Sequence, residues 1–288
     1  MAMTEGTNTP RVLVAGCGKL GSAIAGLLTD SATTFGLRRN PDRIPEGIHR
    51  LKADLMHPES LKEVVPANLD VVIYCLTPAS YDEQGYRDAY VNGLANLLAA
   101  LGDQPLKRLI FVSSTSVYSQ DDDDWVDENS PTQPSRFSGE QILAGERTAL
   151  ESGHPATIVR FSGIYGPSRQ RFLDEVIAGR MDPQSPAPFS NRIHEEDAAR
   201  AVEFLTRQAL AGESLQDLYI ASDSEPVRLD EVVAWVRQQT PCAEPVEGAR
   251  KGGRAGSKRC SNQRLLGTGF RFHYPSFRDG YRDMIANR

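Results

Sequence analysis

Short apolar runs alternate with amphipathic helical patterns through the first 220 residues, and this alternation restricts the fold more than any other feature of the chain. Six successive runs predict strands: RVLVAG, TTFGL, GIHRLKADL, LDVVIYCL, LKRLIFVSS and PATIVRFSGIYG. Strands that are apolar throughout and alternate with helices form a parallel sheet covered on both faces. The sequence therefore predicts an α/β protein with a doubly wound parallel sheet.

The first predicted strand runs directly into the glycine-rich turn Gly16-Cys17-Gly18-Lys19-Leu20-Gly21, which opens a predicted helix over 19–28. In a G-x-G-x-x-G turn the first glycine permits the tight turn and the second lets a pyrophosphate approach the backbone. The third allows close helix packing, and the helix N-terminus attracts the anion. At the first strand–helix junction this motif predicts a Rossmann-type dinucleotide site that includes Gly16, Gly18, Lys19, Leu20 and Gly21.

The end of the second predicted strand indicates which dinucleotide binds. An acid at this position would bind the ribose hydroxyls of NAD, but the strand ends in Arg38 and Arg39. Guanidinium groups suit a phosphate, so we expect NADP, with NAD as the alternative. The next two strands add Asp54, Leu55 and Leu76 to the predicted cofactor site. Asp54 either meets the adenine edge or caps the helical segment that begins near Pro58, and the two roles are compatible.

The pattern changes after Gly166, where a proline-rich stretch precedes further helices and a glycine-rich basic stretch. We therefore predict a dinucleotide-binding Rossmann domain over 1–166 with 191–222, and a small substrate-binding lobe over 167–190 with 223–288. The basic stretch over 249–259 is interpreted as a mobile loop first and as an anion-binding loop second.

Charge and composition exclude several classes of protein. The net charge is −6 and no Lys/Arg run is long, which argues against a nucleic-acid surface. The first ten residues lack an apolar stretch and no run is long enough to span a bilayer, so we expect a cytoplasmic protein. The cysteines and histidines show no ligand spacing, which predicts no metal site and reduced thiols.

Several stretches together resemble the extended branch of the short-chain dehydrogenases/reductases, the NAD-dependent epimerase/dehydratase-like family. Besides the glycine turn, the matching stretches, in chain order, are ADL, YVNGLANLLAA, FVSSTSVY, VRFSGIYGP and RIHEEDAARAV. The resemblance implies a carbonyl or hydroxyl substrate, which Ser114 would polarise. It also implies a homodimer formed by the helices that carry Asn92 and Ser138.

The resemblance also implies a Tyr-x-x-x-Lys pair on the helix after the fifth strand, in which the tyrosine transfers the proton and the lysine lowers its pKa. Here Ser138 and Ile142 occupy those positions, and every tyrosine in the chain lacks a lysine four residues on. Serine is a poor acid at neutral pH. Tyr118, Tyr165 and Tyr81 follow strand ends and are alternative proton carriers, although each is more often a wall residue.

The roles of several other polar residues can be interpreted in more than one way. Asn92 either shapes the active site or packs by hydrogen bonding, whereas His194 is interpreted as structural. The acidic run over 120–128 is interpreted as a solvated loop. If Arg169, Arg171 and Arg259 converge, the substrate is anionic.

Two functions are therefore open. The first is an atypical NADP-preferring oxidoreductase or epimerase that acts on a small-molecule substrate, with Ser114, Tyr118 and Ser138 as catalytic candidates. The second is a catalytically silent NADP(H)-binding sensor or regulator, which the missing tyrosine–lysine pair favours.

Overall fold

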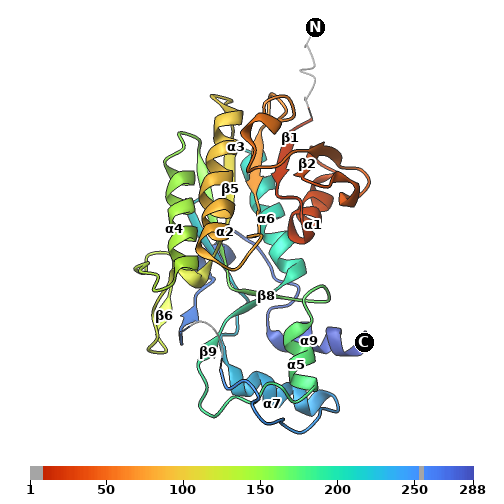
Figure 1. Cartoon of the computed structure of the whole chain (residues 1–288), viewed down its shortest axis with the longest axis vertical. Helices are drawn as coiled ribbons and strands as arrows, with labels where there is room; N and C mark the ends of the chain where they lie inside the picture. Colours follow the sequence, from red (N-terminus) through yellow and green to blue (C-terminus); the bar gives the residue numbers. More distant parts are fainter. Residues whose placement is uncertain (1–8, 253–255) are drawn as a thin grey trace. The chain divides into compact units, whose positions relative to one another are not determined.

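The computed structural model describes residues 9–252 and 256–288 of the chain. Its main sheet has seven parallel strands in the order β11-β7-β5-β4-β1-β2-β3 (Figure 1). These strands are β1 (Arg11–Ala15), β2 (Thr33–Arg38), β3 (His49–Lys52), β4 (Val71–Tyr74), β5 (Arg108–Ser114), β7 (Ala156–Phe161) and β11 (Leu218–Ala221). The chain order reverses at β1, which lies between β2 and β4, as in doubly wound dinucleotide-binding sheets. The predicted α/β fold is confirmed.

Helices follow most of the strands. The α-helices of the described ranges are α1 (Lys19–Leu28), α2 (Glu83–Arg87), α3 (Gly93–Leu101), α4 (Phe137–Leu150), α5 (Arg171–Ile177), α6 (Glu195–Leu210), α7 (Leu229–Gln239), α8 (Gln263–Gly267) and α9 (Phe277–Ala286). Short 3₁₀ turns are η1 (Pro41–Arg43), η2 (Pro58–Ser60) and η4 (Thr115–Val117). In the part of the chain that the structure covers, no helix is both long enough and apolar enough to cross a bilayer.

Two predicted elements are divided in the structure. The sixth predicted strand breaks at Ser162 into β7 and β8 (Gly163–Tyr165), because β8 leaves the main sheet and pairs with β10 (Arg192–His194). The helix expected to carry Asn92 contains a π-helical turn, η3 (Asp88–Asn92), between α2 and α3. Both breaks depend on tertiary contacts that periodicity does not record.

The chain forms two compact units. The first comprises the described part of Met1–Val112 with Ala144–Ile158 and Val202–Asp217. Within it, β1 and β4 are almost wholly buried and pair in register, with Leu13 opposite Val72, because both strands are apolar on both faces. These two strands place the glycine turn at their carboxyl ends.

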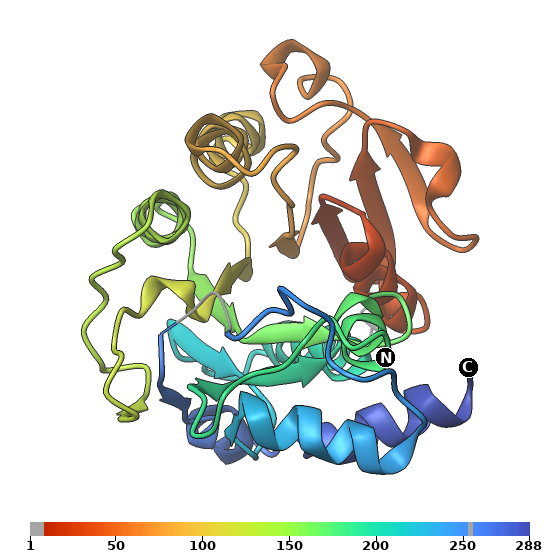
Figure 2. The ribbon, with the colours of Figure 1, turned by 60° about the horizontal axis from the view of Figure 1, so that its bottom comes forward.

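The second unit comprises Ser113–Leu143, Val159–Ala201 and Leu218–Arg288. Its apolar core is built from α5, α7 and α9, which bury Val176, Val236, Phe277 and Tyr281. Figures 1 and 2 both show α7 and α9 lying side by side. The division predicted from the sequence, with a dinucleotide-binding domain and a smaller lobe, stays a prediction.

Four short strands complete the second unit. They are β6 (Trp125–Val126), β9 (Phe189–Ser190), β12 (Val227–Arg228) and β13 (Arg259–Cys260). β12 pairs with β9 in the antiparallel direction, and β13 pairs with β6 in the parallel direction. The second pairing joins the carboxyl-terminal part of the chain to the loop that follows β5.

Candidate functional site

The glycine turn after β1 has a backbone that only glycine supports at two positions. Gly16 has φ +91°, and a Cβ atom there would lie 2.4 Å from the carbonyl oxygen of Cys75. A Cβ atom on Gly21 would lie 2.5 Å from the carbonyl oxygen of Gly16. The N–H groups of Gly16 and Cys17 both donate to the Leu37 carbonyl, at 3.1 and 3.0 Å, so the turn is fixed against β2.

Gly18 serves the turn in a different way. It precedes α1 as its N-cap and supplies no side-chain cap, and a Cβ atom there would approach only the Gly16 oxygen, at 3.9 Å. The first N–H groups of a helix have no partners within the helix and attract an anion. The first turn of α1 carries no acidic side chain. The open backbone at Gly18 therefore fits the pyrophosphate of a dinucleotide.

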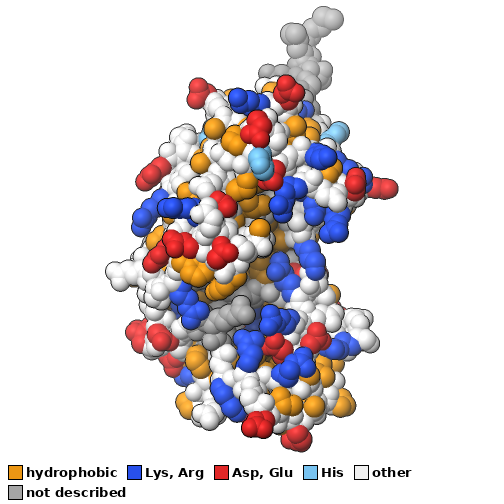
Figure 3. Space-filling model, viewed as in Figure 1, with side chains coloured by type: hydrophobic (Ala, Val, Ile, Leu, Met, Phe, Trp, Pro, Cys, Tyr) orange, Lys and Arg blue, Asp and Glu red, His pale blue; other side chains and the backbone are white. Residues whose placement is uncertain are grey.

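A cavity of about 530 Å³ opens beside this turn in the first unit. Figure 3 shows hydrophobic side chains gathered over this region, with Lys and Arg side chains on the side of α1 and β2. Of the ten predicted cofactor-binding residues, seven line the cavity: Gly16, Gly18, Arg38, Arg39, Asp54, Leu55 and Leu76. Lys19, Leu20 and Gly21 lie in the first turn of α1 and are not among its lining residues.

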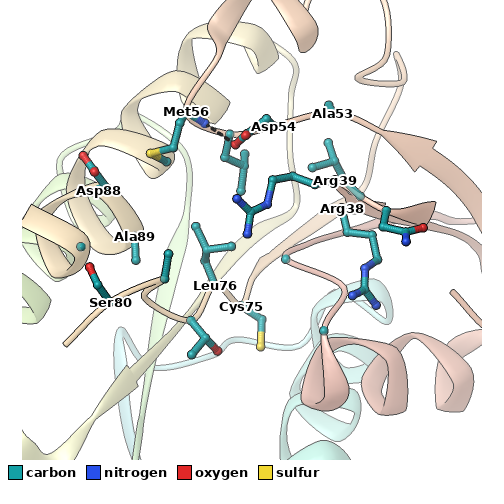
Figure 4. Close-up of a pocket in the computed structure, with 18 of the residues that line it drawn as sticks. Arg38, Arg39, Ala53, Asp54, Met56, Cys75, Leu76, Ser80, Asp88 and Ala89 are labelled. Carbon is teal, nitrogen blue, oxygen red and sulfur yellow. Dashed lines mark hydrogen bonds between the residues drawn. The ribbon is translucent and has the colours of Figure 1, made fainter. Parts of the chain in front are cut away.

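The two arginines at the end of β2 point in different directions (Figure 4). Arg38 turns toward α1 and donates from Nη1 to the Cys17 carbonyl at 3.1 Å, so it holds the glycine turn. Arg39 points into the cavity, and no hydrogen bond or ion pair joins it to another residue in the described ranges. The guanidinium of Arg39 is therefore available to an anionic ligand.

Asp54 lies on the far wall of the cavity and organises its own loop. Its Oδ1 accepts from the Met56 N–H at 3.0 Å, and its Oδ2 lies 3.4 Å from Nδ1 of His57. Its backbone N–H bonds to the Ser60 hydroxyl at 3.0 Å. The side chain thus stabilises the turn before η2, whose N-cap is His57, and it still faces the cavity.

A π-helical turn forms the cavity wall opposite the arginines. Tyr74 donates to the Ala89 carbonyl at 2.6 Å, and Asp88 accepts from Asn92 at 2.8 Å. A Cβ atom on Gly93 would meet the Tyr74 hydroxyl at 2.6 Å, so the helix can approach β4 only because this residue is glycine. Such turns are frequent at functional sites.

The sequence analysis did not identify the π-helical turn or its neighbours as part of the site. The cavity-lining residues that it missed include Met56, Ser80, Gln84, Asp88 and Ala89. Asn92 was the one polar residue on this helix to be singled out, and the structure gives it a hydrogen bond within the π turn. Both readings of Asn92 remain open.

The hydroxyl cluster Ser113 to Ser116 belongs to the second unit and alternates in burial. Ser113 and Thr115 are buried, Ser114 is half-buried and Ser116 is exposed. The Oγ atom of Ser114 accepts from the Ser116 N–H at 3.2 Å and so caps η4. Its hydroxyl proton has no acceptor among the residues that the structure covers. Ser114 can therefore donate to a substrate oxygen.

Tyr118 has a fixed set of partners. Its side chain is buried, its hydroxyl donates to the Asp127 carbonyl at 2.8 Å, and it accepts from Nη1 of Arg160 at 2.7 Å. The Arg160 guanidinium also lies over the ring, 4.9 Å from its centroid. Burial raises the pKa of Tyr118 to about 12, although Arg160 acts in the opposite direction. These contacts favour a structural role, and its role as a proton carrier stays a prediction.

The α4 positions of the missing pair face the interior. Ser138 is 8% exposed and Ile142 is 3% exposed. Between them in sequence, Gly139 packs so closely that a Cβ atom would lie 2.7 Å from the Ser116 carbonyl oxygen. Neither side chain supplies an ionisable group at neutral pH.

The other candidate proton carriers differ in exposure. Tyr81 is exposed and meets Tyr86 edge to face, with 5.6 Å between ring centroids. Tyr165 is buried against Tyr281 at 4.6 Å, and burial raises its pKa. His194 is buried and accepts at Nδ1 from the Glu196 N–H at 3.3 Å. Burial lowers the pKa of His194, although nearby acids act in the opposite direction.

The three arginines expected to line the substrate site have separate partners. Arg171 pairs with Glu175 at 3.0 Å, and Arg169 lies 3.9 Å from Glu195. Arg259 stacks over Trp125, with its guanidinium carbon 5.2 Å from the ring centroid. Convergence on one anion is therefore not evident in the second unit.

The acidic run is not simply solvated. Asp121 accepts from the Ser257 N–H at 2.6 Å, and Asp123 bonds to the Ser257 hydroxyl and pairs with Arg228. The bonds to Ser257 and Arg228 lower the pKa of Asp123. Together, the bonds of the two aspartates fix residues 257–259 at the end of the basic stretch. Residues 253–255 of that stretch lie outside the described residues. In the described ranges no group of His, Cys, Asp and Glu side chains could hold a metal ion.

Comparisons with known proteins agree with this geometry. The profile of the NAD-dependent epimerase/dehydratase family matches residues 12–221. A Methylobacillus flagellatus structure, provisionally described as an NAD-dependent epimerase/dehydratase, is 34% identical with a TM-score of 0.83. The match covers 97% of this chain and 99% of that one.

Two further relatives are more distant. Thermus thermophilus UDP-glucose 4-epimerase in complex with NAD is 22% identical with a TM-score of 0.74, over 94% of this chain and 96% of that one, and shows likeness of fold. N-acetyl-alpha-D-glucosaminyl-diphospho-ditrans,octacis-undecaprenol 4-epimerase of Escherichia coli O157:H7 is 24% identical over 164 residues. That match covers 53% of this chain and 48% of the relative, so the chain spans about half the length of the curated relative.

Proposed function

Because the chain belongs to the NAD-dependent epimerase/dehydratase family, we propose that it is an enzyme that binds NADP in the cavity of the first unit. It would act as an oxidoreductase or an epimerase on the carbonyl or hydroxyl group of a small substrate. The dinucleotide would supply or accept the hydride. The glycine turn, Arg38, Arg39 and the apolar residues Leu55 and Leu76 would hold it.

The preference for NADP is supported by one observation: Arg39 points into the cavity at the end of β2, where NAD-binding proteins carry an acid. A guanidinium with no protein partner gains a charge-assisted hydrogen bond from a 2′-phosphate and nothing comparable from a ribose hydroxyl. Arg38, by contrast, is engaged with the Cys17 carbonyl and would serve either dinucleotide.

Calorimetry on three variants tests this proposal. Arg39→Gln should lose about tenfold to a hundredfold in affinity for NADPH and leave NADH binding unchanged, because it removes one charged hydrogen-bonding group. Arg38→Gln should weaken both dinucleotides alike, because it loosens the turn. The control is Arg43→Gln, on the exposed 3₁₀ turn η1 outside the cavity lining. Equal losses of NADH and NADPH in Arg39→Gln would reject the preference.

The substrate class that we propose is that of the UDP-sugars. The Thermus thermophilus structure is that of a UDP-glucose 4-epimerase, so UDP-sugars are the first substrates to test. The diphosphate of a UDP-sugar is negatively charged, so these compounds also agree with the anionic substrate expected from the sequence. Turnover that is lost in Ser114→Ala would support an enzyme in which Ser114 orients the substrate oxygen.

A silent sensor of NADP(H) is the second candidate function. It is favoured by the burial of Ser138 and Ile142 on α4, where the family carries its acid–base pair. Tight NADPH binding without turnover of any UDP-sugar, aldehyde or ketone would favour the sensor. The homodimer and the cytoplasmic location stay predictions.

A further inference from the structure

A tryptophan at the surface of the second unit is held in place by its neighbours. Trp125 of β6 is 56% exposed, although tryptophan side chains are on average highly buried. β6 pairs with β13, and the guanidinium carbon of Arg259 lies 5.2 Å from the ring centroid of Trp125. Arg259 in turn donates from Nε to the Asp123 carbonyl at 2.8 Å. The second unit therefore presents an aromatic ring in a fixed position.

Trp125 borders a cavity of about 300 Å³ whose lining residues all belong to the second unit. None of these residues lines the dinucleotide cavity of the first unit. The polar lining residues follow β11 and β13 in the chain, and they are Asp223, Ser224, Ser261, Asn262 and Gln263. The lining thus combines one aromatic ring with several hydrogen-bonding groups, which is typical of sites for small polar ligands.

Asp223 is a lining residue with an unused hydrogen-bonding atom. Its side chain is 1% exposed, and its Oδ1 atom accepts from the Glu225 N–H at 3.3 Å. Its Oδ2 atom is buried and has no hydrogen-bond partner in the part of the chain that the structure covers. A buried polar atom without a partner is costly. A ligand in the cavity that hydrogen-bonds to this carboxyl group would remove that cost.

The other polar groups of the lining also have unused capacity. Asn262 donates from Nδ2 to the Ser222 carbonyl at 2.9 Å and to the Ser224 Oγ atom at 3.0 Å. These bonds fix its amide group and leave its Oδ1 atom without a partner in the described ranges. The Ser261 Oγ atom accepts from the Gln263 N–H at 3.4 Å. The hydroxyl protons of Ser224 and Ser261 have no acceptor among the described residues. A ligand would therefore meet both donors and acceptors.

The chemistry of the lining favours a neutral ligand with hydroxyl groups. Burial raises the pKa of Asp223 well above its ordinary value, although Arg192 acts in the opposite direction. A hydroxyl can donate to an ionised carboxyl group or accept from a protonated one, whereas an ammonium group can only donate. Arg259 over the Trp125 ring disfavours a second cation there. No lysine or arginine is among the residues that line this cavity, which argues against an anion.

We propose that this cavity binds the ring of a neutral sugar, which stacks on Trp125 and exchanges hydrogen bonds with Asp223 and Asn262. The apolar C–H face of a sugar ring fits an aromatic side chain, and its hydroxyls both donate and accept. The inference goes beyond the proposed function and does not rest on it, because the second unit alone forms this cavity. The ring belongs either to a free sugar or to a larger glycosyl compound, and the two sources are distinguished below.

The fluorescence of Trp125 tests the inference directly. The chain has two tryptophans, so Trp235→Phe leaves Trp125 as the single tryptophan. Titration of this variant with D-glucose should change the emission in a saturable way, with a dissociation constant in the millimolar range. Tetramethylammonium chloride, a cationic probe of the same ring, should give no saturable change. No saturation with glucose, or saturation with tetramethylammonium alone, would overturn the inference.

Calorimetry with D-glucose on the full chain measures the contribution of each group. Trp125→Ala should weaken glucose binding at least about tenfold and leave NADPH affinity unchanged, because it removes an exposed ring from the second unit. Asp223→Ala should also lose about tenfold, because it removes a hydrogen-bonding partner. The matched control is Val246→Ala, on a 47% exposed apolar residue of the same unit, which should bind glucose like wild type. Wild-type glucose affinity in Trp125→Ala would contradict the inference even if Asp223→Ala failed to fold.

Calorimetry with UDP-glucose on wild type and Trp125→Ala identifies the source of the ring. Weaker binding of both UDP-glucose and glucose in Trp125→Ala would assign the cavity to a glycosyl compound. Weaker binding of glucose alone, or a wild-type protein that does not bind UDP-glucose, would assign it to a free sugar. The proposed function fails separately, because a protein that gives no heat with NADPH or NADH and still binds glucose would overturn that function alone.

Discussion

The glycine turn of the first unit and the α4 face of the second unit are both places where the family resemblance predicts functional residues. In the turn, Gly16 and Gly21 hold positions that only glycine supports, and Gly18 leaves the backbone open before the first turn of α1. The α4 face carries Ser138 and Ile142, both buried, where the family resemblance predicts a tyrosine and a lysine. The proposed binding site is built from backbone in one region, whereas the predicted chemistry depends on single side chains in the other.

The difference teaches how such a site can change. A glycine turn cannot be altered one residue at a time, since a side chain at Gly16 would collide with the neighbouring strand. A proton carrier can come from any element that reaches the substrate. The following changes test whether the two regions differ in this way.

Gly16→Ala should have the largest effect. Its φ of +91° and the 2.4 Å approach to Cys75 would cost about 4 kcal/mol of unfolding free energy and abolish dinucleotide binding. The matched control is Gly26→Ala within α1, where a Cβ atom meets nothing within 4 Å. The control should gain roughly 0.5–1 kcal/mol from helix propensity. Urea unfolding and calorimetry with NADPH measure both, and a Gly16→Ala protein of wild-type stability would contradict the comparison.

Restoring the family pair should damage the protein and not activate it. Ser138→Tyr with Ile142→Lys places a phenol and an ammonium group in buried positions, at a cost of about 3 kcal/mol. Leu150→Lys, on the exposed end of the same helix, should have little effect. Urea unfolding and UDP-glucose turnover are the measurements. A stable double variant with faster turnover would show that the α4 face is open to substrate.

Local patterns account for the parts of the fold that the sequence predicted well. The first and last residues of α1, Lys19 and Leu28, agree with the prediction. The glycine turn starts this helix, and the apolar stripe of the helix defines its length. Seven predicted residues line one cavity because each lies at or just after the carboxyl end of a strand. The predicted strand over 47–55 shortens to β3, because its neighbours in the sheet, and not its composition, decide where pairing ends.

Long-range contacts account for what was missed. The π turn depends on the Tyr74 hydroxyl and on the fit of Gly93 against Met56. Lys258 lies in a stretch that reads as a basic loop, and its burial follows from the pairing of β13 with β6, far away in sequence. The acidic run of the sequence contained a cue, because Asp121 and Asp123 bond to Ser257 in the same segment.

Tyr118 should give a smaller, pH-dependent effect. Its pKa is raised to about 12 in the folded state, so its contribution is complete below the unfolded value near pH 10 and is lost as the pH rises toward 12. The unfolding free energy of wild-type protein should fall by roughly 2 kcal/mol more than that of Tyr118→Phe over this range. Urea midpoints between about pH 9 and pH 12 give the difference. Parallel profiles would mean that the hydroxyl is not held as the Arg160 and Asp127 contacts indicate.

His194 should give the smallest effect, at the opposite end of the pH scale. Burial holds its pKa below the ordinary value of 6.5, so the unfolded chain takes up a proton before the folded protein does. Its contribution is therefore present above about pH 6.5 and is lost as the pH falls through the lowered folded value. Between pH 7 and pH 5 wild-type protein should lose up to about 1 kcal/mol more than His194→Gln. An equal loss in both proteins would place a charged imidazole in the folded state, which the buried Nε2 atom, without a partner among the described residues, argues against.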